Sequence, residues 1–234
     1  GLPHCLEHLV FMGSESYPNR GFLDKLANLC ISQGTNAWTD RDHTAYNAVC
    51  AGPVGLRRLL PVLIDHVLSP TLTDAQFATE VYHVDGEGAQ KGVVFCEMQG
   101  RESTEDDLAD INLYQLLYPA SPYSFECGGL TPDIATLSNE EVRAYHARFY
   151  TPENCLVLVH GLVPIASIQE ALDEWYDQWL KRQGGASPNT PEQVVSPPSC
   201  MPRFTSVVQR NGPNHLCGPG EVLGGYAAAS LGPR

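Results

Sequence analysis

The chain has 234 residues, 43% of them hydrophobic and 18% charged, which is the composition of a globular protein with room for one large domain or two small ones. Its apolar runs stay below the 18 or so residues that a membrane-spanning helix requires, so we expect no membrane among its partners. The formal net charge of −13 would repel the phosphates of a nucleic acid, and it suits a soluble surface or a site that attracts basic peptides or metal ions.

The first part of the chain predicts two helices followed by a pair of strands. Residues 3–12 have helical periodicity and end at Gly13. A second helix is predicted over 21–33, before Gly34. Its apolar face would be formed by Phe22, Leu26 and Leu29. Apolar and polar residues then alternate around a turn at 40–43, which indicates two strands.

Further helices are marked by periodicity and by capping patterns. Leucines at helical spacing predict a long helix over 54–68. The S/T-x-x-E/Q pattern at Thr73 and at Ser138 predicts helices that begin near residues 74 and 139, because the two side chains of the pattern satisfy backbone donors at a helix start.

A strand and a helix complete the periodic part of the chain. CLVLVHG (155–161) predicts a buried strand, and 165–181 an amphipathic helix. Helices that alternate with strands over residues 1–182 indicate an α+β domain with helices packed on a sheet. From residue 183 the chain is rich in Pro, Ser and Gly, and we expect 183–234 to be a linker followed by a weakly structured tail.

Eight cysteines are scattered along the chain, and no two of them form a C-x-x-C pair. Five lie inside apolar stretches, where a free cysteine behaves as a small hydrophobic residue. These are Cys5, Cys30, Cys50, Cys96 and Cys155. This usage predicts a reduced, intracellular protein, located in the cytoplasm or alternatively in mitochondria.

The segment HCLEH at residues 4–8 is the candidate functional motif. At 100° per residue, His4, Glu7 and His8 fall within one arc of a helix, and the leucines of the segment lie on the opposite face. Two imidazoles at i and i+4 can bind one Zn²⁺, and Glu7 can reach a water bound to that metal. An ordinary helix with a satisfied histidine pair is the alternative, but H-x-x-E-H is also the inverted zincin motif.

With this motif the chain resembles the pitrilysin/insulinase family of zinc peptidases, the inverzincins. GTNAWTDRDHTAYNAV is similar to the family's substrate-flanking strand pair. The run from SPYSFECGGL to NCLVLVHG matches the family's succession of Tyr, Gly-Gly, helix, Tyr-x-Pro-x-Asn and strand. Gly128-Gly129 within that run is interpreted only as a backbone turn. The form GVVFCEMQG is more similar to the branch of presequence-degrading peptidases than to insulin-degrading enzymes.

The resemblance has consequences for the fold and for the metal. It covers residues 1–182 and implies a metallopeptidase half-domain of the pitrilysin type, with helices on one face of a mostly antiparallel sheet. It also implies a third ligand on another helix, and KGVVFCEMQG looks like the segment that carries it, which makes that ligand Glu97. One Zn²⁺ per chain would then be held by His4, His8 and Glu97.

Rivals for the third ligand lie near Glu97. They are Glu87 in a glycine-rich loop, Glu102 in a polar run where a solvated carboxylate is expected, and His83. Glu97 alone follows an apolar stretch, 93–96, that would hold it in the core.

The implied activity is hydrolysis of peptide bonds. The metal would keep an open position for a water, and Glu7 would take the proton of that water and deliver it to the leaving amine. The resemblance adds that Asn36 and Ala37, on an edge strand, bind the backbone of a peptide substrate by strand addition. The alternative is that these two residues only form the turn into a strand.

The chain resembles only part of such a peptidase. Family members close a chamber with a second, similar half that supplies an Arg and a Tyr to the reacting carbonyl, and nothing in 183–234 resembles that half. We therefore expect the C-terminal half of the same full-length protein as a partner, and feeble activity of this chain alone. A non-catalytic family member that serves as a structural or partner subunit is the alternative function, for which a degenerate motif would be expected.

Overall fold

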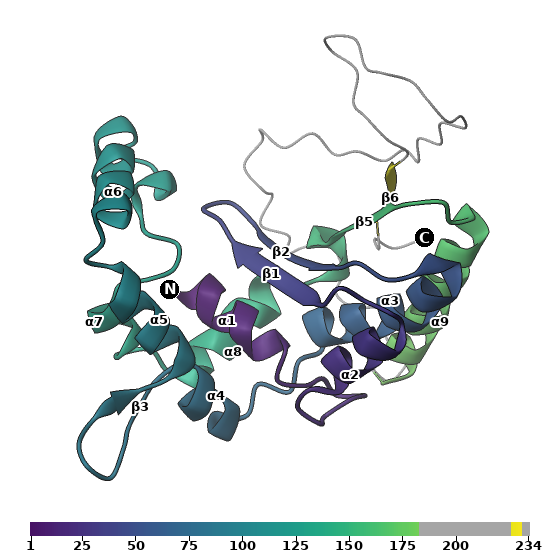
Figure 1. The fold of residues 1–234 in the computed structure, drawn as a ribbon, viewed down its shortest axis with the longest axis horizontal. Coiled ribbons are helices and arrows are strands. Elements are labelled where there is room, and N and C mark those ends of the chain that lie inside the picture. Colours follow the sequence, from purple (N-terminus) through teal and green to yellow (C-terminus); the bar gives the residue numbers. More distant parts are fainter. Residues whose placement is uncertain (183–225, 231–234) are drawn as a thin grey trace.

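A computed structural model describes residues 1–182 and 226–230 (Figure 1). Its helices and strands are α1 (Leu2–Val10), α2 (Phe22–Leu29), β1 (Thr35–Thr39), β2 (Thr44–Ala48), α3 (Gly52–Leu68), α4 (Asp74–Glu80), β3 (His83–Val84), β4 (Gln90–Lys91), α5 (Val93–Arg101), α6 (Glu105–Leu117), α7 (Thr131–Ile134), α8 (Asn139–Phe149), β5 (Leu156–His160), α9 (Ile165–Arg182) and β6 (Tyr226–Ser230). Short 3-10 turns lie at Pro122–Ser124 and Pro152–Asn154. Within these residues, none of the helices combines the length and apolar content that a bilayer crossing requires. The predicted α+β fold class is confirmed.

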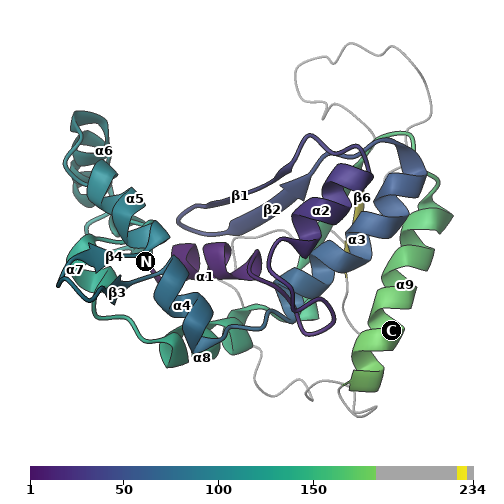
Figure 2. The same ribbon diagram turned by 60° about the horizontal axis from the view of Figure 1, so that its bottom comes forward.

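The described strands form three separate antiparallel pairs instead of one continuous sheet. β1 and β2 make a hairpin in the register Thr35↔Ala48 to Thr39↔Thr44, with its turn at the predicted place. α1 packs against this hairpin (Figure 2). The inner face of the hairpin therefore lies over the helix that carries the HCLEH motif.

Two helices begin where the capping pattern predicts. α4 starts at Asp74, after Thr73, whose backbone N–H donates to the Gln76 side chain at 2.8 Å, while the Gln76 N–H donates to the Thr73 hydroxyl at 3.3 Å. α8 follows Ser138, which makes the same reciprocal pair with Glu141. Each box pairs two backbone donors that a helix start otherwise leaves open, so a four-residue pattern suffices to place the boundary.

α2 is shorter than predicted and presents a different face to the core. The helix ends at Leu29, and Ile31 adopts the left-handed conformation, with φ of 53°. A β-branched residue rarely takes this conformation, so no stop signal is visible in the sequence before Gly34. Leu29, predicted to face inward, is 79% exposed, and Leu23 and Ala27 are buried instead.

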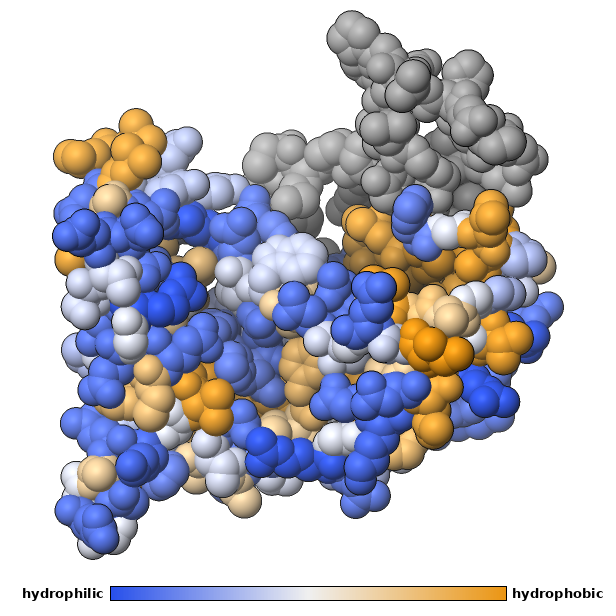
Figure 3. Space-filling view, viewed as in Figure 1, coloured by the Kyte–Doolittle hydropathy of each residue, from blue (hydrophilic) through white to orange (hydrophobic). Residues whose placement is uncertain are grey.

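β5 is buried on one face only, which corrects the prediction of a buried strand. Val157 and Val159 pack with the tryptophans of α9, whereas Leu156 and Leu158 are 57% and 61% exposed. Side chains alternate across a strand, so an apolar run is buried throughout only when both faces are covered. Figure 3 shows an apolar area beside the grey atoms over β5, and another at the tip of α6.

β6 pairs antiparallel with β5, from Leu156↔Ser230 to His160↔Tyr226. It belongs to the segment 183–234, for which we expected a linker and a weakly structured tail. The other residues of that segment lie outside the described residues.

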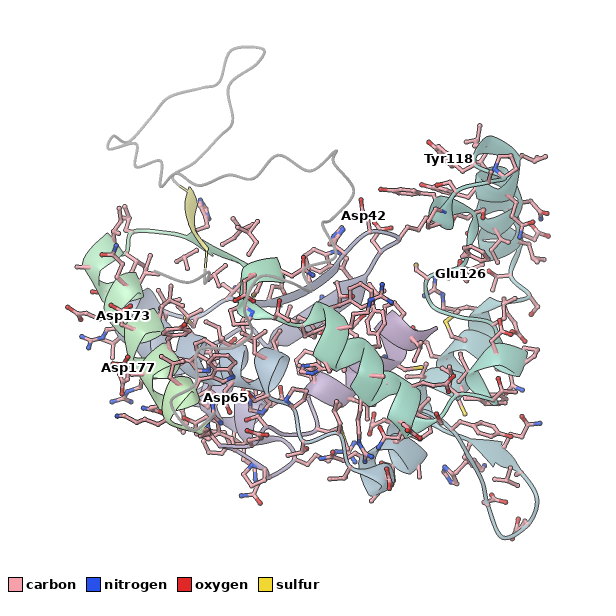
Figure 4. All side chains as sticks on the ribbon, turned by 180° about the vertical axis from the view of Figure 1, so that it is seen from behind. Asp42, Asp65, Tyr118, Glu126, Asp173 and Asp177 are labelled. Carbon is pink, nitrogen blue, oxygen red and sulfur yellow. The ribbon has the colours of Figure 1, made fainter. Side chains whose placement is uncertain are left out.

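The tip of the β1–β2 hairpin is joined to the α6 segment. The Arg41 guanidinium lies 3.4 Å from the centre of the Tyr114 ring and donates to the Asp110 carboxylate at 2.7 Å. Figure 4 shows Asp42, beside Arg41, facing the segment that carries Glu126. These contacts fix the tip of the hairpin relative to α6.

A partly buried ion pair joins the end of α9 to α3. The Arg182 guanidinium donates to the carboxylate of Asp65, a residue labelled in Figure 4. Burial raises the pKa of Asp65, but hydrogen bonds from Arg182 and Ser14 outweigh burial and hold that pKa below its ordinary value. The pair therefore stabilises the folded state above about pH 4, and its contribution is lost as the pH falls through the lowered pKa.

Replacement of Arg182 by alanine is expected to lower the free energy of unfolding by about 2–3 kcal/mol, because the Asp65 carboxylate would remain buried without its partner. The value lies below that for a fully enclosed pair, since the Arg182 side chain is 26% exposed. Chemical denaturation at pH 7 measures the change, with Lys181→Ala, an exposed neighbour on α9, as the matched control. Equal stability of the two variants would contradict a stabilising pair.

Candidate metal centre

α1 presents His4, Glu7 and His8 on one face. Pro3 lies in the first turn, where its missing N–H costs no helical hydrogen bond, and the leucines of the opposite face anchor the helix in the core. His4 is 7% and Glu7 8% exposed, while the His8 side chain is 22% exposed. The helix thus holds three polar side chains together. His4 and Glu7 are buried, and His8 is the member of the group that solvent reaches.

Glu97 reaches the same point from α5. Its Oε2 atom lies 3.4 Å from His8 Nε2 and 3.7 Å from His4 Nε2, and the three ligand atoms all lie within 4.8 Å of one another. In a tetrahedral zinc site with bonds of about 2.0–2.1 Å, neighbouring ligand atoms are about 3.3 Å apart. The donor set fits one Zn²⁺, and the described part of the chain contains no second group of His, Cys, Asp and Glu that meets this spacing.

The position of Glu97 depends on the helical spacing of α5 and not on a continuous apolar run. Val94, Phe95 and Met98 are buried in the same core as α1. Cys96, expected inside the apolar stretch, is exposed. An amphipathic helix buries one stripe, so the residue next to Glu97 in sequence faces away from the core.

A glycine carbonyl holds the second ring nitrogen of His4. His4 Nδ1 lies 3.0 Å from the Gly128 carbonyl oxygen, so Nδ1 carries the proton, and the lone pair of Nε2 is left free on the side of Glu97, where it could bind a metal. Gly129, with φ of 91°, packs so closely that a Cβ there would lie 2.5 Å from the Gly1 Cα. The interpretation of Gly128-Gly129 as only a backbone turn misses the contact of the Gly128 carbonyl with His4. In the sequence, the Gly-Gly pair itself is the one sign that the backbone comes close to another segment here.

The electrostatics of the centre favour neutral imidazole. The pKa of His8 lies below its ordinary value, first because burial penalises the imidazolium and second because His4 lies beside it. The nearby carboxylates, chiefly Glu97, oppose this shift without reversing it. A lowered pKa keeps the ring neutral at pH 7, with a lone pair for a metal.

The β1–β2 hairpin contacts Glu7 directly. The Thr39 hydroxyl donates to Glu7 Oε2 at 2.5 Å, and Thr44 Oγ1 lies 3.2 Å from Thr39 Oγ1. Among residues 1–182, no hydrogen bond is made to the other carboxylate oxygen, Oε1. One oxygen of Glu7 is therefore held by the protein and the other is available. Nothing in the sequence distinguishes Thr39 from the other threonines of the hairpin.

The rival ligands lie elsewhere. Glu102 accepts hydrogen bonds from the Thr131 hydroxyl at 2.8 and 2.9 Å, so it is not the solvated carboxylate expected in a polar run. Glu87 is exposed between β3 and β4, and His83 Nδ1 lies 2.7 Å from the Ala78 carbonyl oxygen. Of the candidates, Glu97 joins the two histidines.

β1 has no strand on its outer edge among the described residues. The Asp40 N–H donates to the His43 carbonyl at 2.8 Å, and hydrogen-bonded pairs alternate along an antiparallel ladder. Asn36 therefore pairs with β2 and exposes its side chain, whereas Ala37 directs its N–H and C=O to the open edge. Substrate binding by these two residues stays a prediction, in which Ala37 offers the main-chain groups.

Comparison with known proteins identifies two family models that match the chain. The model described as insulinase (Peptidase family M16) matches residues 1–95, and the model described as Peptidase M16 inactive domain matches residues 136–215. The first match includes the HCLEH motif.

Individual relatives agree with these models. An uncharacterised protein of Caenorhabditis elegans is 47% identical over 175 residues, covering 74% of this chain and 18% of that protein. The mitochondrial presequence protease of Xenopus laevis is 30% identical over 198 residues, covering 81% of this chain and 19% of that protein. The chain thus spans less than a fifth of the length of these curated relatives.

A solved structure shares the fold. The crystal structure of a protease from Helicobacter pylori matches 75% of this chain and 39% of its own, with a TM-score of 0.63 and 22% identity. The match agrees with the expected half-domain architecture of helices and antiparallel strands.

Proposed function

Because the chain belongs to the insulinase family of peptidases, family M16, we propose that it is the zinc-binding part of a metalloendopeptidase that uses Glu7 as its general base. The observation that carries the proposal is the convergence of His4, His8 and Glu97, whose ligand atoms lie within 4.8 Å of one another. Glu7 lies on the same helix face as the two histidines. Its carboxylate would therefore reach a water molecule that is bound at the metal position and faces the substrate.

The residues of the centre divide the work of binding the ion and moving the proton in this proposal. The neutral imidazoles and the Glu97 carboxylate hold the ion, and the Gly128 carbonyl keeps His4 in the tautomer that binds through Nε2. When bound, zinc acidifies a water molecule and polarises the scissile carbonyl. Glu7 Oε1 accepts the proton released by the attacking water and later donates it to the departing amine, which leaves as a neutral group.

We also propose that a peptide substrate adds to the open edge of β1, where Ala37 supplies the main-chain donor and acceptor and Asn36 a side-chain contact. The net charge of −13 would favour peptides with basic residues.

The C-terminal half of the full-length protein is proposed to complete the site. The small fraction of the curated relatives that this chain spans supports the proposal. Donors that stabilise a developing oxyanion are commonly worth about 10² to 10³ in rate, and an open site also leaves the substrate poorly oriented. We expect the 234-residue chain to bind zinc yet to cleave peptides feebly or not at all.

A quenched fluorescent peptide library tests this proposal with the 234-residue chain and with the full-length protein, each with and without a chelator. Turnover by the full-length protein that is sensitive to the chelator and restored by zinc would support a metallopeptidase. Full turnover by the short chain would show that a second half is dispensable. A full-length protein that binds zinc without turnover would instead favour a structural or partner subunit.

We propose a reducing compartment, either the cytoplasm or mitochondria. The six cysteines of the described residues are free, and presequence proteases among the relatives are named mitochondrial. Thiol titration of native material under denaturing conditions should therefore find all eight cysteines of the chain reduced. Several protected pairs would overturn this assignment and indicate an oxidising compartment.

A further inference from the structure

A row of two threonine hydroxyl groups runs from Glu7 across the β1–β2 hairpin. Thr39 Oγ1 lies 2.5 Å from Glu7 Oε2 and 3.2 Å from Thr44 Oγ1. The hydroxyl of Tyr46, from the same hairpin, lies 3.1 Å from the hydroxyl of Tyr150, which follows α8. Burial raises the pKa of both phenols, so both keep their protons as donors at neutral pH.

The chemistry of the groups gives this row a direction. A carboxylate oxygen only accepts hydrogen bonds, so Thr39 must donate its single proton to Glu7. The Thr39 oxygen can then only accept from Thr44, whose proton is committed in turn. Thr39 and Thr44 face each other across the hairpin in a pair without mutual backbone hydrogen bonds, the kind whose side chains approach most closely.

We propose that Thr39 is a positioning residue for Glu7, and that Thr44 orients the Thr39 hydroxyl for this purpose; the inference rests on the proposed role of Glu7. Glu7 lies on a helix and has three rotatable side-chain bonds, so the helix alone does not fix its carboxylate. The hydroxyl of Thr39 holds Oε2 against the hairpin and leaves Oε1 turned to the reacting water.

The rate of proton transfer depends on this orientation. A misplacement of about 1 Å can cost as much as 10²-fold in rate even when every reacting group is present. A hydroxyl that only satisfies a buried polar group would change stability when removed, and would leave the rate of the folded enzyme unaltered.

The test compares Thr39→Val with Thr39→Ser in the full-length protein. Valine has nearly the shape of threonine and suits a strand, but lacks the hydroxyl, while serine keeps the hydroxyl. We expect Thr39→Val to lower kcat by about 10- to 100-fold with little change in KM and with zinc retained, and Thr39→Ser to restore most of the loss. Thr44→Val should lower kcat several-fold by the same route.

Thr35→Val is the matched control, because Thr35 lies on the same strand and its hydroxyl donates to Asp24 at 2.7 Å, away from Glu7. It should leave kcat unchanged. Wild-type kcat in folded Thr39→Val, beside an inactive Glu7→Gln, would overturn the positioning role alone. If Thr39→Val fails to fold, wild-type kcat in Thr44→Val overturns it instead. An active Glu7→Gln would overturn the proposed function itself.

Discussion

Glu7→Gln abolishes peptide hydrolysis and leaves the metal in place: this is the expected result of the most direct test of the mechanism. Glutamine has the shape of glutamate and can still accept the Thr39 hydrogen bond, but it cannot take up the proton of the attacking water. General acid and base contributions are about 10² to 10⁴ in rate, and Glu7 has both tasks, so kcat should fall by about 10³ or more. Zinc stays because the ligand atoms belong to His4, His8 and Glu97.

Two measurements on the full-length protein check this result, kcat on a fluorescent peptide and zinc content by elemental analysis. Glu140→Gln, an exposed glutamate of α8, is the control for the loss of one negative charge. Persistence of wild-type turnover in Glu7→Gln would refute a general base at this position. Loss of zinc in that variant would mean that Glu7 is itself a ligand.

Removal of a ligand should have the opposite pattern, with the metal lost first and activity lost as a consequence. His8→Ala and Glu97→Gln each leave two of the three protein donors, fewer than a catalytic zinc site uses. Loss of an outer-shell partner already costs about 10- to 100-fold in metal affinity, so loss of a ligand should exceed that range. Zinc content after dialysis against a weak chelator should fall to near background.

His83→Ala and Glu102→Gln are the controls, because both residues were rival ligands and both contact other groups. They should retain full zinc. Undiminished zinc in His8→Ala would rule out the centre, whereas loss of zinc in Glu102→Gln with retention in Glu97→Gln would move the third ligand to the rival position.

Local patterns account for what could be predicted from the sequence. Thr73 and Ser138 place two helix starts because a capping box is complete within four residues. His4 and His8 share a face because helical geometry alone brings i and i+4 together. The alternation around the 40–43 turn is likewise enough to place the hairpin.

What could not be predicted depends on groups that are distant in sequence. The Gly128 carbonyl meets His4 only through the folded chain, and a backbone oxygen leaves no trace in residue type. Thr39 is one of several threonines until the hairpin lies over α1. Leu158 belongs to an apolar run, and only the positions of the neighbouring elements decide that its face is exposed.

In the proposed function, the centre would also work as a reversible cross-link. α1 and α5 supply its donors from points about 90 residues apart in the chain, so a bound ion closes a long loop whose ends would otherwise gain freedom on unfolding. An ion that binds only the folded form raises the free energy of unfolding, and this gain grows with the concentration of free metal. Removal of the ion reverses the gain. The stability of the intervening hairpin and helices would thereby depend on zinc supply, so that scarcity of the ion would expose this part of the chain to proteolysis before the rest.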